Sequence, residues 1–409
     1  MSSPSRLLAG TFLTTALLAG PALAQGEPVQ SAPPNAPDQT PASEGQTRAP
    51  QPESPVALNQ EVIAEGLPHL WAMEFLPDGR MLVTAKSGVL HIITPEGEVS
   101  EAISGLPEVD AVGQGGLLDV ALANDFAETG RIFVSFSEPR EGGNGTSVAS
   151  ARLVLEEGGG GASLEDVAVI FRQEPTYDGR LHFGSRIVPT DNGSLYVTVG
   201  ERSDDPIRDQ AQELQSGLGK IFRITPEGEP VEGNPFADGN DGALPEIWSL
   251  GHRNVQSATL DDEGRLWTVE HGARGGDELN LPEAGRNYGW PEVAYGITYG
   301  GAPIEGGITQ SAETEQPVYY WDPVIAPSGM AYYQGDEFPE WDDTFLVGGL
   351  VAQAVVVLHM EGDRVAQERH IDIGARVRDV RVGPDGAVYA VTESRNSGQS
   401  SIVKLTKAG

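Results

Sequence analysis

Turns rich in Asp, Asn and Gly recur along the chain, and each precedes a short run of alternating apolar residues. The clearest copies are Pro77–Val83, Thr190–Val197, Asp262–Trp267 and Pro384–Tyr389, and weaker copies start at Thr129 and Asp342. Six units, marked by Gly79, Gly130, Gly193, Gly264, Asp343 and Gly386, follow one another at intervals of 43 to 79 residues. Alternation behind a tight turn predicts β-hairpins.

Hairpins repeated at this period are typical of propeller blades, which bury their faces against their neighbours. We therefore predict an all-β fold over residues 56–409, a six-bladed β-propeller with four-stranded antiparallel blades. A pair of β-sandwiches is the alternative, because turn spacing alone does not fix closure. Helical patterns are nearly absent, and Arg208–Gly219 is the best candidate for a short helix.

The first 24 residues have the order of a secretory signal peptide: Arg6, an apolar run from Leu7 to Leu18, and then Ala22-Leu23-Ala24. The apolar run is too short to span a bilayer, so we expect no membrane span and a periplasmic or secreted protein. Residues 25–55 are rich in Pro, Gln, Ser, Ala and Glu without apolar periodicity, which predicts a disordered, Pro-rich linker.

Composition narrows the possible partners. The formal net charge is -34, and the chain has no cysteine. Disulfides therefore do not stabilise the fold, and nucleic acid is not expected as a partner because its binding requires clusters of Lys and Arg. A neutral small molecule or a cation fits the charge better, and both a monomer and a homodimer remain open.

The segment from Glu270 to Pro291 is the most informative part of the chain. Gly272, Gly275 and Gly276 let the main chain approach a ligand and turn its carbonyls outward, while Asp277 and Glu278 add the hard oxygens that Ca2+ prefers. The segment predicts a calcium-assisted binding loop. The alternative is a glycine-rich turn with a solvated acidic pair.

His182 precedes a predicted strand and is expected in a loop, where a neutral imidazole could act as a general base toward a substrate hydroxyl. Glu201 ends the following strand and could emerge beside His182 to orient it. The alternatives are an ordinary loop histidine and a strand-end charge paired with Arg202 in solvent.

Several polar side chains could bind a charged ligand. Gln114 sits in a glycine turn and can both donate and accept hydrogen bonds. Arg253 and Asn254 follow Gly251-His252, and the alternation of Arg376 and Arg378 about Val377 places both on one strand face. Two arginines there suit a ligand with several carboxylates, although they could instead pair with acidic residues of the protein.

Together these motifs resemble those of the soluble PQQ-dependent aldose sugar dehydrogenases, relatives of soluble glucose dehydrogenase. The resemblance runs in order from about Val62 to Lys407, and it rests on eight separated motifs. They are Gly-Gln-Gly-Gly-Leu-Leu, His-Phe-Gly-Ser-Arg, Gly-Glu-Arg, Gly-His-Arg-Asn, Glu-His-Gly-Ala-Arg-Gly-Gly-Asp-Glu, Asn-Tyr-Gly-Trp-Pro, Ala-Pro-Ser-Gly and Arg-Val-Arg-Asp. The resemblance implies pyrroloquinoline quinone (PQQ) at the mouth of the propeller channel, with Ca2+ polarising the quinone.

The resemblance also assigns roles. His182 matches the base that removes the proton of the sugar's anomeric hydroxyl, and Glu201 matches its supporting acid, which is Asp in the glucose dehydrogenases. The cofactor-contacting positions match Gln114, Arg253, Asn254, Tyr299, Arg376 and Arg378. Backbone carbonyls of Gly272 and Ala273 match the ligands of the quinone's calcium, whereas Glu278 and Tyr288 match a second, structural calcium site.

One departure concerns the cofactor. Where these relatives often carry a lysine beside the quinone, this chain has Gly349-Leu350-Val351-Ala352, so the lysine position falls on Val351. Losing one hydrogen bond to a charged group costs about 1.5 to 3 kcal/mol. Weaker PQQ binding is therefore expected unless Arg376 and Arg378 compensate.

The leading hypothesis is PQQ- and calcium-dependent oxidation of aldoses to lactones, with electrons passed to an external acceptor. No side chain accepts hydride, so this chemistry requires a cofactor, and no Gly-x-Gly-x-x-Gly motif opens a helix for a nicotinamide. The alternatives are a calcium-dependent sugar lactonase and a non-catalytic propeller that binds glycans or protein.

Overall fold

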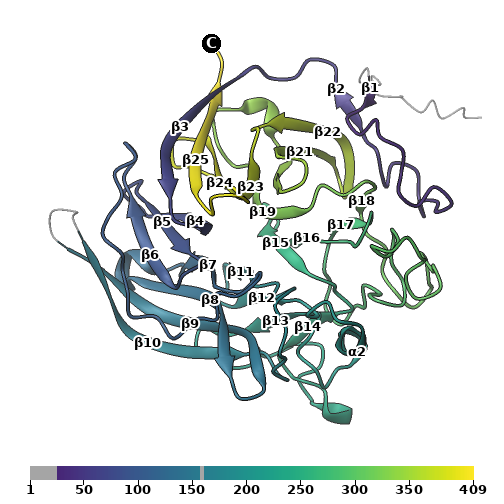
Figure 1. Cartoon of the computed structure of the whole chain (residues 1–409), viewed down its shortest axis with the longest axis horizontal. Helices are drawn as coiled ribbons and strands as arrows, with labels where there is room; N and C mark the ends of the chain where they lie inside the picture. The colour runs from purple at the N-terminus through teal and green to yellow at the C-terminus, as the bar shows by residue number, and fades with distance from the viewer. Residues whose placement is uncertain (1–24, 157–160) are drawn as a thin grey trace, which may run out of the picture.

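The computed structural model describes residues 25–156 and 161–409, and in it six antiparallel sheets surround a central axis (Figure 1). The first three blades are β4–β6 (Leu70–Phe75, Met81–Ala85, Val89–Ile93), β7–β10 (Leu117–Leu122, Arg131–Arg140, Gly143–Leu155, Ala162–Arg172) and β11–β14 (Ile187–Pro189, Leu195–Val199, Lys220–Ile224, Ile247–Leu250). The other three are β15–β18 (Val255–Leu260, Leu266–Glu270, Asp277–Asn280, Tyr319–Trp321), β19–β22 (Pro327–Tyr332, Thr344–Gly349, Ala354–Glu361, Arg364–Asp372) and β23–β25 with β3 (Arg376–Val382, Val388–Glu393, Ser400–Lys407, Leu58–Leu67). The predicted six-bladed propeller is confirmed.

Two blades differ in how their outer strand is supplied. In the blade of β4–β6, isolated bridges from Val99 to Ile93 and from Ile103 to Leu90 extend the sheet beyond β6. In the last blade, β3 from the N-terminal part of the chain pairs antiparallel with β25 from the C-terminal end. This pairing joins the two ends of the propeller and closes the ring.

The repeated turns occupy one end of the propeller. The six marker residues, Gly79, Gly130, Gly193, Gly264, Asp343 and Gly386, each lie between the first and second strands of a blade, and each has a positive φ. The first strands β4, β7, β11, β15, β19 and β23 contact one another in sequence around the axis, and β23 contacts β4. The residues that precede these six strands consequently converge at the opposite end of the channel.

Hydroxyl groups join neighbouring blades near the axis. Thr84 Oγ1 accepts the Ala72 N–H within its own blade and donates to the Leu118 carbonyl of the next blade, at 2.6 Å. Ser135 and Thr198 make equivalent bonds in the next two blades. Each hydroxyl thus satisfies backbone groups of two sheets at once.

Buried charges cross-link the innermost strands. Arg186, beside β11, pairs with Asp119 on β7 at 2.8 Å and with Asp379 on β23 at 3.0 Å. Arg381 lies 3.1 Å from Asp379 and 3.5 Å from Glu74 on β4. The two guanidinium groups offset the negative charges of the buried Asp119 and Asp379 and so join strands of different blades.

The N-terminal segment differs from the expectation of a disordered linker. In residues 25–55, β1 (Gln25–Pro28) pairs with β2 (Pro50–Pro52), and the chain lies against the outer edge of the propeller beside β18 and β22 (Figure 1). Ala36, Gln46 and Ala49 are buried there. Composition predicted disorder because the partners that order the segment lie almost three hundred residues away. The expected signal peptide, residues 1–24, lies outside the described residues.

The expected helix over Arg208–Gly219 is only partly present. The structure has α2 (Asp205–Arg208) and a 3-10 turn over Asp209–Gln212, and the helical path ends there. The buried ammonium group of Lys220 accounts for this, because it binds the carbonyls of Gln210, Ala211 and Leu218. Among the described residues, no helix is long and apolar enough to cross a membrane.

We expect the Arg186→Met substitution to lower the free energy of unfolding by about 3 kcal/mol, since it leaves two buried carboxylates without that partner. Chemical denaturation measures this loss. Arg131→Met is the control, because Arg131 pairs with Glu227 at the surface and its removal should cost less than about 1 kcal/mol. Equal losses in the two variants would show that the buried network does not stabilise the ring.

Candidate active site

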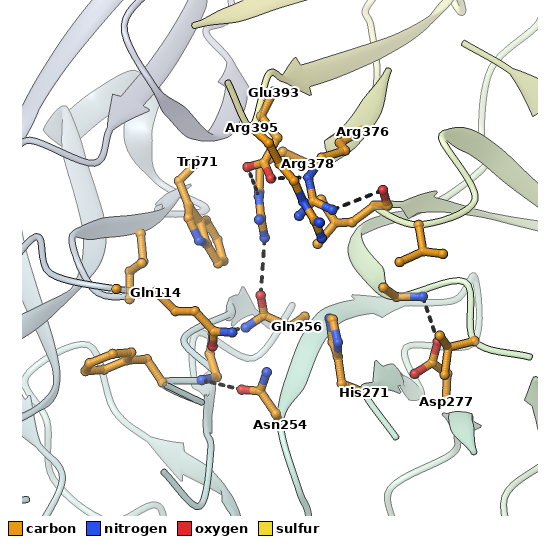
Figure 2. Close-up of a pocket in the computed structure, with 18 of the residues that line it drawn as sticks. Trp71, Gln114, Asn254, Gln256, His271, Asp277, Arg376, Arg378, Glu393 and Arg395 are labelled. Atoms are coloured by element: carbon orange, nitrogen blue, oxygen red, sulfur yellow. Dashed lines mark hydrogen bonds and ion pairs between the residues drawn. The ribbon is translucent and has the colours of Figure 1, made fainter. Parts of the chain in front are cut away.

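A cavity of about 450 Å3 opens at the end of the channel away from the repeated turns. Among its lining residues are Gln114, Asn254, Gly272, Ala273, Tyr299, Arg376 and Arg378, all predicted from the sequence. Gln114 and Asn254 precede the first strands of their blades, and Gly272 and Ala273 follow the second strand β16. Tyr299 lies in the loop between β17 and β18, and Arg376 and Arg378 lie at the start of the first strand β23. Figure 2 shows Arg376, Arg378, Glu393 and Arg395 on one side of the cavity and Gln114, Asn254 and His271 across from them.

His182 and Glu201 form a buried pair beside this cavity. His182 lies in the loop before β11, Glu201 follows β12, and the His182 Nδ1 atom is 2.6 Å from Glu201 Oε2. The Ser203 N–H also donates to Oε2. We assign the Nδ1–H tautomer to His182, because a carboxylate accepts that hydrogen bond. His182 Nε2 has no partner among the residues that the structure describes, so it is free to accept a proton.

The loops around this pair adopt unfavourable backbone conformations. His182, Ser185, Arg202 and Ser203 all have positive φ values, between 49° and 97°. Non-glycine residues are seldom held there, and such strain clusters at functional sites. A dense set of hydrogen bonds compensates for it, including Arg202 Nε to the Leu181 carbonyl and Arg202 Nη2 to the Gly179 carbonyl.

Burial and charge set the protonation of the pair. Burial lowers the pKa of His182, and the Glu201 carboxylate opposes this without reversing it, so the imidazole is neutral near pH 7. Burial raises the pKa of Glu201, but the charge of His182 and its hydrogen bond outweigh burial and bring that pKa below the ordinary value. The pair therefore combines a neutral base with an ionised carboxylate.

Two amide side chains link His182 to the cavity. Gln114 Oε1 accepts the His182 N–H at 2.9 Å, and Asn254 Oδ1 accepts the Gly184 N–H at 3.0 Å. Each amide uses its oxygen for the protein, so each NH2 group is left as a donor toward the cavity that both side chains line.

One wall of the cavity is cationic. Arg376 Nε and Arg378 Nε bind the two oxygens of Glu393 at 2.7 and 2.9 Å, which confirms that both arginines share one face of β23. Burial raises the pKa of Glu393, but Arg378 and the other donors outweigh it and bring the pKa far below its usual range. Lys86 and Arg395 also line the wall, and no carboxylate pairs with either in the described part of the chain.

The sequence did not predict Glu393, Lys86 or Arg395 at the site. Lys86 follows β5, and Glu393 and Arg395 lie at the end of β24 and just beyond it. Position in the chain was the only indication for them, since each lies at the end of the second strand of a blade or just after it. Burial and the nearby charge of Arg378 lower the pKa of Lys86.

The glycine loop forms the facing wall. Asp277 Oδ1 accepts the Gly272 N–H at 2.8 Å, and Asp277 Oδ2 accepts the Ala326 N–H at 2.7 Å. Both carboxylate oxygens of Asp277 therefore accept backbone N–H groups, whereas the sequence suggested that Asp277 binds a metal ion. Burial raises the pKa of Asp277 to about 7. Arg253 Nη1 donates to the Gly272 carbonyl at 2.6 Å, so the guanidinium group fixes the position of this oxygen.

A smaller cavity lies behind this loop. Arg253, Gly272, Glu278 and Tyr288 line it together with Glu270. Burial, followed by the negative charge of Glu270, raises the pKa of Glu278 well above its ordinary value. A bound cation would relieve this repulsion, and the chemistry of the donors suits a hard cation.

Two predicted residues mark the mouth of the large cavity. Tyr299 is 71% exposed and Val351 is 53% exposed, and both line the opening. Neither is buried by the protein itself, so both are available to contact a bound molecule. The structure thus brings all of the predicted site residues to one end of the propeller.

Comparisons with known proteins agree with this geometry. Residues 67–404 match the family model described as glucose / sorbosone dehydrogenase. The aldose sugar dehydrogenase YliI of Escherichia coli K12 is 42% identical over 83% of this chain and 91% of that protein. Quinoprotein glucose dehydrogenase B of Acinetobacter calcoaceticus is 24% identical over 85% of this chain and 88% of its own length.

Solved structures are similar throughout the propeller. The apo-form of the E. coli soluble aldose sugar dehydrogenase superposes with a TM-score of 0.79 and 40% identity, over 86% of this chain and all of that one. A PQQ-bound aldose sugar dehydrogenase from Streptomyces coelicolor has a TM-score of 0.70 and 29% identity, over 86% of this chain and 99% of that one. The chain therefore belongs to the glucose / sorbosone dehydrogenase family, and it is an oxidoreductase that acts on sugars.

Proposed function

We propose that this protein oxidises aldoses at the anomeric carbon to lactones, with PQQ as the hydride acceptor and Ca2+ at the quinone. The observation that carries the proposal is the buried His182–Glu201 pair beside a cavity with a cationic wall. A neutral base and an anion-binding wall are the two features that deprotonation of a sugar and retention of a carboxylated quinone require. The relative from S. coelicolor, which binds PQQ, supports the cofactor.

The cavity fits PQQ in size and charge. Its volume of about 450 Å3 lies within the usual range for pockets that bury a small molecule. PQQ carries three carboxylates, and the wall of Lys86, Arg376, Arg378 and Arg395 contains one carboxylate, Glu393. The wall can therefore bind an anion, even though Val351 provides no charge. Lys86 and Arg395 compensate for the lysine that the resemblance led us to expect.

In this mechanism His182 Nε2 takes the proton of the anomeric hydroxyl while the anomeric carbon loses hydride. PQQ, when bound, supplies the electrophilic centre that accepts the hydride. Glu201 holds the Nδ1–H of His182 and stabilises the imidazolium that forms. Gln114 accepts the His182 N–H and so fixes the backbone of His182. Arg202 donates to the Leu181 carbonyl and holds the residue that precedes His182. The electrons then leave to an external acceptor.

Oxygen donors of the glycine loop would hold the two cations. Gly272 and Ala273 line the large cavity, and their carbonyls would bind the calcium beside the quinone. The smaller cavity would bind a second, structural calcium through Glu278 and Tyr288. Carboxylate and carbonyl oxygens are the ligands that Ca2+ prefers. A periplasmic or secreted location completes the proposal.

Reconstitution tests the proposal directly. Purified protein supplied with PQQ and Ca2+ should reduce an artificial electron-acceptor dye when glucose or another aldose is added. His182→Ala should lower kcat by roughly 10²- to 10⁴-fold while PQQ still binds, because only the base is removed. A variant that kept near-normal turnover would show that His182 is not the base. Hydrolysis of a sugar lactone without dye reduction would instead favour the lactonase.

The pH profile tests the role of Glu201. In the wild type, kcat/KM should decrease as the pH falls through the pKa of His182. Burial lowers that pKa, so the midpoint of the decrease should lie below the ordinary imidazole pKa. Glu201→Gln removes the charge that raises the pKa of His182, so the midpoint of the decrease in kcat/KM should move to still lower pH. At pH 7 kcat should nevertheless drop, roughly tenfold or more, since the imidazole loses its orientation and basicity. A midpoint that moved to higher pH in Glu201→Gln would contradict the role given to Glu201.

Arg378 tests the cationic wall. Arg378→Ala should raise the dissociation constant of PQQ by roughly tenfold or more, the usual effect of losing a hydrogen bond to a charged group. Quenching of tryptophan fluorescence during a PQQ titration measures this constant. Arg152→Ala is the control, because Arg152 lies in a different, surface cavity and pairs with Glu165 there. Unchanged PQQ affinity in Arg378→Ala would place the quinone elsewhere.

A further inference from the structure

The N-terminal segment, residues 25–55, contacts the back of the glycine loop that forms one wall of the site. Asp322, the residue after β18, is the centre of this contact. Its Oδ1 accepts the N–H and the Nδ2–H of Asn35, both at 2.8 Å, and its Oδ2 accepts the Ala36 N–H at 2.9 Å. Asp322 is buried, so these donors satisfy a carboxylate that water does not reach.

Asp322 in turn packs directly against the glycine loop. A Cβ atom added to Gly275 would lie 2.7 Å from Asp322 Oδ1, and the neighbouring Gly276 N–H donates to the Trp321 carbonyl at 2.8 Å. Asn35 Oδ1 also accepts a hydrogen bond from Arg274 Nε at 3.0 Å. Asn35 therefore bridges Asp322 and the glycine loop.

A second contact holds the other side of the loop. Gln39 makes a reciprocal pair with Gly296: its Oε1 accepts the Gly296 N–H at 2.7 Å, and its Nε2 donates to the Gly296 carbonyl at 2.9 Å. The next residue, Ile297, exchanges two backbone hydrogen bonds with Arg274. Gln39 thus fixes the segment against which the glycine loop lies.

We propose that Asn35 and Gln39 are positioning residues of the active site, which hold the Gly272–Gly276 loop so that its carbonyls bind the cation beside the quinone. The inference rests on the proposed calcium role of Gly272 and Ala273. Asn35 and Gln39 precede residue 67, so they lie outside the residues that match the family model. Hydrogen-bonded partners of metal ligands typically contribute 10- to 100-fold to metal affinity.

The test compares a double variant, Asn35→Ala with Gln39→Ala, with Gln51→Ala. Within residues 25–156 and 161–409, the Gln51 side chain donates only to the Glu27 carbonyl of the same segment, at 3.2 Å, so its removal leaves the glycine loop untouched. In the double variant, the Ca2+ concentration that gives half-maximal reconstitution should rise about tenfold. The kcat and the KM for sugar at saturating PQQ and Ca2+ should stay unchanged, because His182 and Glu201 lie on another blade. Gln51→Ala should match the wild type.

Hydrogen exchange supplies a second readout that needs no cofactor. The amides of Arg274 and Gly276 should exchange faster in the double variant than in the wild type and in Gln51→Ala. The exchange rates show whether the N-terminal segment holds the Gly272–Gly276 loop, even if PQQ does not reconstitute the wild-type protein. If the double variant misfolds, Gln39→Glu replaces it, since glutamate still accepts the Gly296 N–H but cannot donate, and a smaller shift is expected.

Two results would overturn the inference. One is unchanged amide exchange at Arg274 and Gly276 in the double variant. The other is a lower melting temperature with an unchanged Ca2+ requirement, which would show that the segment only stabilises the fold.

Discussion

Closure of the ring of first strands is the constraint on which the site depends. Each first strand contacts the next, and β23 returns to β4, so the residues ahead of all six strands meet around one opening. Arg186 secures this closure by binding carboxylates from β7 and β23. His182, Arg253 and Arg376 are far apart in sequence, and only a closed ring brings such residues to one site.

The site also carries a local positive charge, opposite in sign to the net charge of the protein. The chain carries a formal charge of -34, yet one cavity wall gathers Lys86, Arg376, Arg378 and Arg395. Glu393 orients two of these cations without neutralising the wall. A local field of this kind favours an anionic cofactor inside the cavity, while the acidic exterior discourages binding to nucleic acid and anionic membranes.

Much of the fold and the site could be predicted from the sequence, because both depend on short local patterns. The Asp-Gly turns indicated the six blades, and His182 with Glu201 could be paired because they bracket consecutive strands of one blade. Glu393 escaped prediction because its role depends on a cross-strand neighbour, which no local motif specifies. The N-terminal segment was predicted to be disordered because its composition is polar, whereas Asp322 supplies an acceptor that composition cannot reveal.

The central claim is that one cavity holds PQQ between the cationic wall and the carbonyls of the glycine loop. A crystal structure of the protein grown with PQQ and Ca2+ tests this most directly. The account predicts the quinone carboxylates against Arg376 and Arg378, and a cation within bonding distance of the Gly272 carbonyl oxygen, about 2.3 to 2.6 Å. An empty cavity at saturating PQQ, or a quinone bound away from His182, would contradict it.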